Sequence, residues 1–370
     1  MHQINALDHQ TIREFWLLPQ CCHAYVHAPK VMKSPTPLVS VIIPAYNCAP
    51  FIDGTLESVY RQRYKNWEII LVDDGSTDDT RATIAPHMDR IRYYCQENRG
   101  TAAARNAGVR RARGGLIAFL DNDDIWLPEK LELQVQAMQT WPDCGLVFTD
   151  GKTFTESGIR RDSVISRRLA GWIAQHGTSD PMVVKGWLTR ELFFVNEIAS
   201  ASSVMVRKEC LESVGGFDER IVITDDYDLW LRITQRYPIV LLRSCLYMWR
   251  WREDSQSGSI FGRQHRWTEA SITVLEKHWP SAPPEIRTAV RTWLSKMYWY
   301  CGRTYFDQNS FQNSRKMFLG CLHYNRVFVP AMLFLLASYL SPSFIDRLRQ
   351  IKRQASKTWQ QIRSPSCNAT

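Results

Sequence analysis

The sequence predicts an α/β protein with a doubly wound, mostly parallel sheet flanked by helices, followed by a helical appendage. Three observations support this fold class. Short apolar runs alternate with helical stretches of about 10–15 residues, which is the pattern of successive parallel βαβ units. Several of these runs stop abruptly at clusters of carboxylates. From about residue 265 onward the pattern becomes helical and rich in aromatic residues.

Composition places the chain among ordinary globular proteins. Its 370 residues are 45% hydrophobic and 22% charged, which suits one large domain and an appendage. The ten cysteines are scattered apart from Cys21 and Cys22, and their spacing fits neither a metal site nor a disulfide framework. A reducing, cytoplasmic location is therefore expected, and no secretory signal is recognisable near the N-terminus.

Changes in pattern divide the chain into successive segments. Pro35 and Pro37 indicate a linker before the first strand, and we assign no chemistry to the residues that precede it. The segments are an N-terminal extension (1–37), a sheet domain (38–255) with a first half (38–150) and a second half (151–255), a helical appendage (256–340) and a basic tail (341–370).

Each element of the first half follows from its residues. Apolar runs of four to eight residues between turn residues are typical of buried strands, and apolar residues on one helical face indicate the helices between them. Right-handed crossovers then join the strands into a parallel sheet. The expected strands are 39–44, 67–72, 91–95 and 116–120, with a helix that starts at Pro50 and an Ala-rich helix that ends at Ala112.

The strand 116–120 leads directly into the acidic sequence Asp121-Asn122-Asp123. Ligands of open α/β sheets bind at the carboxyl ends of the strands, and alternate carboxylates suit a divalent cation that also contacts phosphate oxygens. We interpret Asp121 and Asp123 as a metal–diphosphate site. The alternative is an acidic turn before the helix that Pro128 opens.

Two further loops are expected at the same edge of the sheet. Parallel strands direct their carboxyl ends to one side, so the loops that carry Tyr46, Asp73 and Asp121 converge there. The Asp73 carboxylate can accept a hydrogen bond from the imide N–H of a uracil, and Tyr46 can stack on the base. The sequence therefore predicts a nucleotide diphosphate site rather than unrelated acidic turns.

These motifs resemble glycosyltransferase family 2, a family of inverting nucleotide-sugar transferases with the GT-A fold. The resemblance rests on VSVIIPAYN, VDDGSTDDT, ENRGTAAARNAG, FLDNDDIWLPEKL, SSVMVRKECLESVGGFDE and ITDDYDLWLRI, which occur in the family's order. It implies a nucleotide-sugar half at 38–150 and an acceptor half at 151–255. It also implies that Mn²⁺ or Mg²⁺ binds the DxD motif, with Asp123 as the direct ligand. The implied nucleotide-binding residues are Pro44, Ala45, Tyr46, Asp73 and Asn122.

A second acidic cluster, at residues 225–228, opens a helix in the acceptor half. Carboxylates are favourable at a helix N-terminus, so an acidic first turn without a catalytic role remains an alternative. The resemblance implies that Asp226 is the general base for the acceptor hydroxyl. Asp225 takes the place of the family's glutamate and is an acceptor-side candidate.

Arginines and tryptophans supply the remaining candidates. The family often places a basic residue over the diphosphate near the position of Arg250 and Arg252, which makes both candidates for that contact. Trp172 and Trp187 are candidates for stacking on an acceptor sugar and fit equally well as core residues. The sequence does not contain the Gln-x-x-Arg-Trp signature of processive synthases, so we expect transfer of one sugar per encounter.

The net charge of +9 is concentrated in the basic tail, where six basic residues accompany one acid. The tail follows an apolar run, 327–340, that is shorter than the roughly 20 residues that span a bilayer. One interpretation is a helix on the anionic surface of the cytoplasmic membrane leaflet, and the other is a buried helix with a solvated basic end. Because this charge lies far from the acidic strand ends, no nucleic-acid partner is expected.

The expected function is transfer of a single sugar from a nucleotide diphosphate sugar, with a UDP-sugar favoured, to a hydroxyl of a glycan or lipid-linked acceptor. Metal-dependent nucleotidyl transfer is one alternative, but residues 44–47 lack the Gly-rich, basic loop that would hold a triphosphate. A non-enzymatic, basic surface-binding protein is the other, and it leaves the acidic strand ends unexplained.

Overall fold

The computed structural model describes residues 36–252 apart from 178, 179 and 185, residues 264–340, and three single positions beyond them. Nearly all of the expected N-terminal extension and most of the basic tail lie outside these ranges. The described residues form two compact units, a sheet unit and a helical unit that begins at residue 264.

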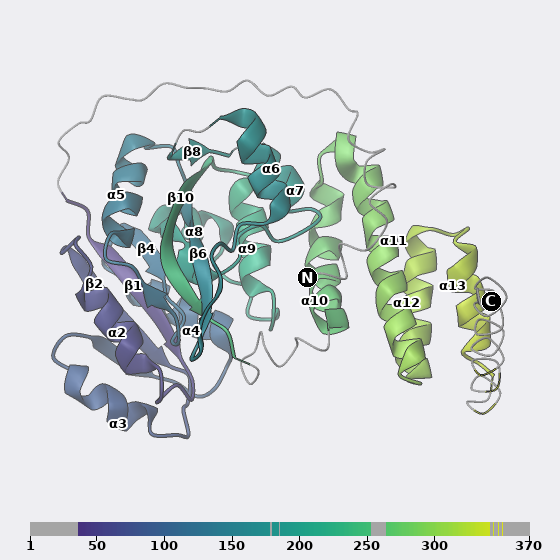
Figure 1. The fold of residues 1–370 in the computed structure, drawn as a ribbon, viewed down its shortest axis with the longest axis horizontal. Coiled ribbons are helices and arrows are strands. Elements are labelled where there is room, and N and C mark those ends of the chain that lie inside the picture. Colours follow the sequence, from purple (N-terminus) through teal and green to yellow (C-terminus); the bar gives the residue numbers. More distant parts are fainter. Residues whose placement is uncertain are drawn as a thin grey trace, which may run out of the picture. The chain divides into compact units, whose positions relative to one another are not determined.

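The sheet unit contains ten strands in one mixed sheet (Figure 1). The path through the sheet is β3-β2-β1-β4-β9-β6-β10-β5, with β7 beside β6 and β8 beside β10. The strands are β1 (Val39–Ala45), β2 (Trp67–Asp73), β3 (Arg92–Cys95), β4 (Leu116–Phe119), β5 (Ile125–Trp126), β6 (Leu146–Thr155), β7 (Gly158–Arg161), β8 (Met182–Val183), β9 (Met205–Arg207) and β10 (Ile239–Arg250).

The expected α/β fold class is confirmed, and its parallel character is clearest in the first half. Strands β3, β2, β1 and β4 are mutually parallel, as the βαβ pattern predicted. Beyond them β9 runs antiparallel to both β4 and β6, while β10 runs parallel to β6 and antiparallel to β5 and β8. The second half therefore joins the sheet through antiparallel pairs, which the apolar pattern alone did not reveal.

Helices cover both faces because residues of the buried strands alternate between them. Odd residues of β1, such as Val41, pack in the core with Leu56 and Leu131, whereas Ile42 on the other face lies against Gly108. The helices of this unit are α2 (Ile52–Tyr60), α3 (Thr80–Ile84), α4 (Thr101–Arg111), α5 (Lys130–Thr140), α6 (Arg167–His176), α7 (Trp187–Glu191), α8 (Lys208–Val214) and α9 (Asp225–Thr234).

The strand register sets the position of the acidic loops. Ala45 pairs with Asp73 at the ends of β1 and β2, and the Leu120 amide donates to the Ile42 carbonyl where β4 ends. The loops after β1, β2 and β4 therefore leave the sheet at one edge, as the parallel arrangement predicted.

The helical unit confirms the expected appendage. Its helices are α10 (Gln264–His278), α11 (Pro284–Asp307), α12 (Phe311–Tyr324) and α13 (Val329–Ala337). Phe306, Phe318 and Ala331 join α11, α12 and α13 in a small apolar core. Tyr298 and Tyr324 both donate to the Glu276 carboxylate, which ties α11 and α12 to α10. None of the helices in the described ranges is long and apolar enough to cross a membrane.

Candidate active site

The end of β2 holds Asp73 in a fixed orientation. Its carboxylate is buried and accepts hydrogen bonds from the Ser76 amide at 2.9 Å and from the Tyr93 hydroxyl at 2.7 Å. Ala45 lies beside it in the register, whereas the Tyr46 side chain is 46% exposed. Tyr46 and Asp73 thus lie at the ends of two paired strands, and their role in holding a nucleotide base stays a prediction.

Asp74, to which the sequence analysis gave no role, organises the loop that opens α4. Its carboxylate accepts from Gln96 Nε2 at 2.7 Å, the Arg99 amide at 3.0 Å and the Gly100 amide at 2.7 Å. Gly100 has φ of 88°, a left-handed conformation that side chains disfavour. The second aspartate of the VDDGS motif thus fixes the start of α4.

The DxD loop contacts the two arginines proposed for the diphosphate, which lie at the end of β10 and just after it. Arg252 Nη2 lies 3.1 Å from Asp123 Oδ2, and Arg250 Nε donates to the Asp123 carbonyl at 3.0 Å. Both guanidinium groups also lie over the Phe51 ring, at 5.2 Å for Arg250 and 4.2 Å for Arg252. The pairing of β10 with β5 produces this contact, because it brings the end of β10 against the loop that follows β4.

Acidic charge accumulates in this loop. Burial raises the pKa of Asp123, the Asp121 carboxylate raises it further, and Arg252 lowers it. Asp124 is fully buried, and burial together with Asp123 and Asp121 raises its pKa well above the ordinary range. Its Oδ1 accepts from the Arg250 amide at 2.9 Å. Asn122 is half-buried between these acids.

Arg105 connects the DxD loop to the acidic turn of α9. It donates to Asp121 Oδ1 at 2.7 Å and to Asp225 Oδ2 at 2.9 Å from a buried position on α4. The sequence analysis missed this residue, although one signal was available. An arginine on the buried face of an Ala-rich helix requires acidic partners, because an unpaired buried charge is costly.

The acidic turn of α9 holds the proposed base. Asp225 is buried against Arg105, and Asp226 is half-buried beside it. The pKa of Asp226 is raised to about 7, first by burial and then by the Asp225 carboxylate, while Arg105 lowers it. A carboxyl group with a pKa near neutrality is suited to accept a proton at physiological pH.

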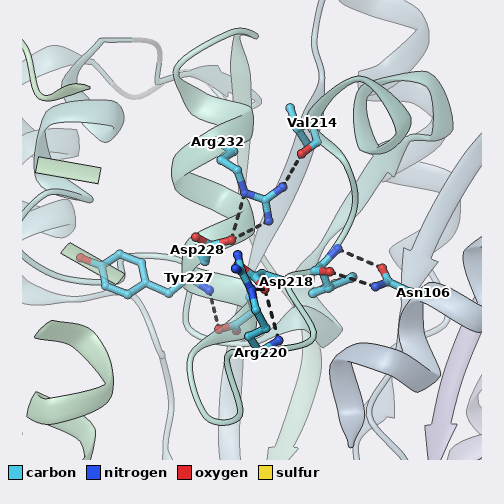
Figure 2. A network of polar contacts seen from close by, with 9 residues as sticks. Asn106, Val214, Asp218, Arg220, Tyr227, Asp228 and Arg232 are labelled. Atoms are coloured by element: carbon cyan, nitrogen blue, oxygen red, sulfur yellow. Dashed lines mark hydrogen bonds and ion pairs between the residues drawn. The ribbon is translucent and has the colours of Figure 1, made fainter. Parts of the chain in front are cut away.

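A network around α9 holds this turn in place (Figure 2). Arg232 Nε donates to Asp228 Oδ2 at 2.9 Å, and its Nη1 donates to the Val214 carbonyl at 2.6 Å. Asn106, on α4, exchanges hydrogen bonds of 2.9 Å with both backbone groups of Phe217 in the loop before α9. The Tyr227 hydroxyl donates to the Leu192 carbonyl. The helix start is thus fixed from several directions.

Trp172 and Trp187 lie together on α6 and α7. Their rings stack with centroids 4.9 Å apart, and the His176 ring stacks against Trp172 at 4.5 Å. Both tryptophans are half-buried. Because the two rings stack on each other, packing between α6 and α7 is sufficient to explain their burial. A role on the acceptor side stays a prediction.

Comparison with known proteins identifies the domain. Residues 40–201 match the family model described as Glycosyl transferase family 2. A segment of 103 residues is 45% identical to the UDP-Glc:alpha-D-GlcNAc-diphosphoundecaprenol beta-1,3-glucosyltransferase WfgD of Escherichia coli. This segment is 27% of this chain and 41% of that protein. The chain also resembles uncharacterized glycosyltransferases of Rickettsia species at 29–31% identity, and it spans about a third to three fifths of their length.

Two solved structures share the fold. TarS 1–349 of S. aureus in complex with UDP has a TM-score of 0.56 at 16% identity, over 81% of this chain and 88% of that one. The mannosyltransferase PcManGT of Pyrobaculum calidifontis, in complex with GDP-Man and Mn²⁺, has a TM-score of 0.50 at 20% identity, over 89% and 91%. At these identities the likeness shows the fold alone. Residues 40–201 of this chain are therefore a glycosyl transferase family 2 domain on a GT-A fold.

Proposed function

We propose that this chain is an inverting glycosyltransferase that moves one sugar from a nucleotide diphosphate sugar to an acceptor hydroxyl. The observation that carries the proposal is the connected acidic site at the carboxyl edge of the sheet. There, Arg105 links Asp121 to Asp225, and Arg252 contacts Asp123. The oriented Asp73 and the exposed Tyr46 follow two strands that end at the same edge.

The proposed reaction is a single displacement. The acceptor oxygen forms a bond to the anomeric carbon while the bond from that carbon to the diphosphate oxygen breaks. The acceptor proton passes to the Asp226 carboxylate, and the nucleotide diphosphate leaves with the bonding electrons. In this proposal Arg250 and Arg252, which contact Asp123, bind the leaving phosphates through charge-assisted hydrogen bonds.

The acidic loop fits a divalent cation. The carboxylates of Asp121 and Asp123 repel each other, and a bound dication would relieve this repulsion. A hard cation needs only one or two protein carboxylates when phosphate oxygens complete its coordination. The described residues contain no cluster of three or more ligating side chains, so the donor phosphates would have to supply part of the coordination. When bound, Mn²⁺ or Mg²⁺ would neutralise charge on the leaving diphosphate.

The relatives suggest the donor and acceptor classes. WfgD is named for transfer from UDP-Glc to a diphosphoundecaprenol-linked sugar, and the TarS structure contains UDP. We propose a UDP-sugar as donor and a glycan or lipid-linked sugar as acceptor for this chain. In this proposal the carboxylate of Asp73, which pairs with Ala45 in the strand register, accepts the imide N–H of a uracil.

A donor-hydrolysis assay tests this function, because water can replace the acceptor. The purified chain is incubated with Mn²⁺ and a panel of UDP- and GDP-sugars, and release of nucleotide diphosphate and free sugar is measured. Glycosyl transfer predicts equal amounts of both products from at least one donor. Release of pyrophosphate when a nucleoside triphosphate and a sugar phosphate replace the nucleotide sugar would instead indicate a nucleotidyltransferase. Absence of any turnover, including with lipid-linked acceptors present, would contradict an enzymatic role.

We further propose that the helical unit contacts anionic membrane at the cytoplasmic face. Helix α13 packs on one side and exposes an apolar stripe on the other, formed by Val329, Met332, Leu333 and Leu336. Arg315 lies 4.6 Å from the ring of Tyr339, immediately after this helix. The six basic residues of the tail follow in the sequence. Apolar burial combined with basic charge is the pattern of helices that lie on anionic lipid.

Replacing both Leu333 and Leu336 by aspartate should therefore weaken binding to anionic vesicles. We expect a loss of about 10-fold or more, because two apolar side chains can no longer enter the lipid. Ile159→Asp, at an exposed apolar position of the sheet unit, is the matched control and should bind as the wild type does. Vesicle co-sedimentation across a salt series measures both effects. Equal partitioning of the double variant and wild type would exclude this surface.

A further inference from the structure

Arg105 joins the two functional halves of the domain through one guanidinium group. Its Nη2 lies 2.7 Å from Asp121 in the DxD loop, and its Nη1 lies 2.9 Å from Asp225 in the first turn of α9. These partners are 16 and 120 residues away in the sequence. Arg105 thus directly connects the loop after β4, which is proposed to bind the donor diphosphate, with the start of α9, which carries the proposed base.

The surroundings of Arg105 restrict its movement. The side chain is 7% exposed, and the Phe217 ring lies 5.3 Å from the guanidinium carbon. Asn106, the next residue of α4, holds the backbone of Phe217. A planar guanidinium that donates from separate nitrogens fixes the direction of both acceptors, which a single ammonium group cannot do.

One feature of this contact is costly for stability. The Nε–H of Arg105 is buried and has no hydrogen bond partner among the residues that the structure describes, although buried donors are normally paired. The guanidinium thus directs its two Nη groups to the two carboxylates and leaves its Nε–H without an acceptor. This geometry favours a role in positioning over a role in packing alone.

We propose that Arg105 is a positioning residue that holds Asp226, through Asp225, at a fixed separation from the DxD loop. This inference rests on the proposed function, because the separation matters only if both groups act on one donor–acceptor pair. A misplacement of about 1 Å can reduce turnover by about 10²-fold, so a rigid link between the two groups would be important for the rate.

The kinetic test uses Arg105→Lys in the full chain. Lysine keeps the positive charge but cannot hold both carboxylates in a fixed geometry, so we expect kcat to fall by about 10–100-fold. The Kd for UDP with Mn²⁺, measured by calorimetric titration, should change by less than about threefold, a difference too small to account for the kcat loss. Arg99→Lys is the matched control, because Arg99 pairs with Glu219 at an exposed position, and its kcat should stay near wild type.

Two results of this test would overturn the inference. A wild-type kcat for Arg105→Lys would mean that charge alone suffices. A loss of UDP affinity as large as the loss of kcat would place the effect at the donor site instead of at the base.

A thermal-unfolding cycle tests the link without activity. Arg105→Met should lower the Tm by about 5–10 °C, because Asp225 would stay buried without its cation. Adding Asp225→Asn should restore at least half of this loss, since the unpaired charge is then removed. Additive Tm changes would contradict the link. If the wild type turns over no donor but the cycle shows coupling, the proposed function fails and the catalytic role of Arg105 fails with it, while the contact itself stands.

Discussion

Replacing Asp226 by asparagine should reduce kcat by about 10²–10⁴-fold, which is the usual contribution of a positioned general base. Asparagine keeps the shape of the side chain but has no oxygen basic enough to accept the acceptor proton. The affinity for the donor should change little, because no donor contact is proposed for this residue. Steady-state kinetics at saturating donor, together with a nucleotide titration, measure both quantities.

Asp225→Asn is the matched control for this experiment. Its amide oxygen can still accept the hydrogen bond from Arg105 Nη1, so we expect a far smaller loss of kcat. If Asp225→Asn were the inactive variant and Asp226→Asn were active, the base would be Asp225. If both variants stayed active, the base would lie elsewhere in the chain.

The pH dependence of kcat/KM should reflect the ionisation of Asp226. The pKa of Asp226 is raised from 3.8 to about 7 by burial and by Asp225, so the carboxylate form becomes available only as the pH rises through this value. We therefore expect kcat/KM to increase with pH up to about 7 and then to level off. Ionisation of this carboxyl group costs more in the folded than in the unfolded chain, so its contribution to the free energy of unfolding falls as the pH rises from about 4 to about 7. Asp226→Asn should remove that part of the decrease.

Asp123→Ala should abolish the metal-dependent rate, with a loss of about 10²-fold or more in kcat/KM. The substitution removes the carboxylate that we propose as the direct ligand of the cation. Folding should survive, because the same change relieves the like charge between Asp121 and Asp123. Activity measurements across a Mn²⁺ series, with a melting curve for each variant, separate these effects.

Asp162→Ala provides the control, because that side chain is 89% exposed and far less constrained. It should behave as the wild type does across the Mn²⁺ series. Full turnover of the wild type in excess EDTA, or an unchanged rate for Asp123→Ala, would contradict a metal held at this position.

Much of the first half could be predicted from the sequence. The apolar runs ending at Asp73 and Asp121 identified strands of a parallel sheet, and parallel strands necessarily bring their carboxyl ends to one edge. The residues at those ends followed from the same argument. Local patterns sufficed here, because β1, β2 and β4 are mostly buried apolar runs and helices separate the strands in the sequence.

Other features depended on contacts between distant residues. The position of Arg250 and Arg252 beside Asp123 results from antiparallel pairing of β10 with β5, which no periodicity encodes. Arg105 was missed because its acidic partner Asp225 is 120 residues away. The stacking of Trp172 on Trp187 likewise depends on how α6 and α7 pack, and the sequence left their role open.

Time-resolved proton NMR of the reaction tests the central claim most directly. The purified chain is mixed with Mn²⁺ and an α-linked UDP-sugar that it hydrolyses, and the anomeric signal of the first sugar released is recorded before mutarotation. A single displacement assisted by Asp226 predicts that the β-anomer appears first and at the same rate as UDP. Initial release of the α-anomer would mean retention of configuration, and it would contradict the proposed mechanism.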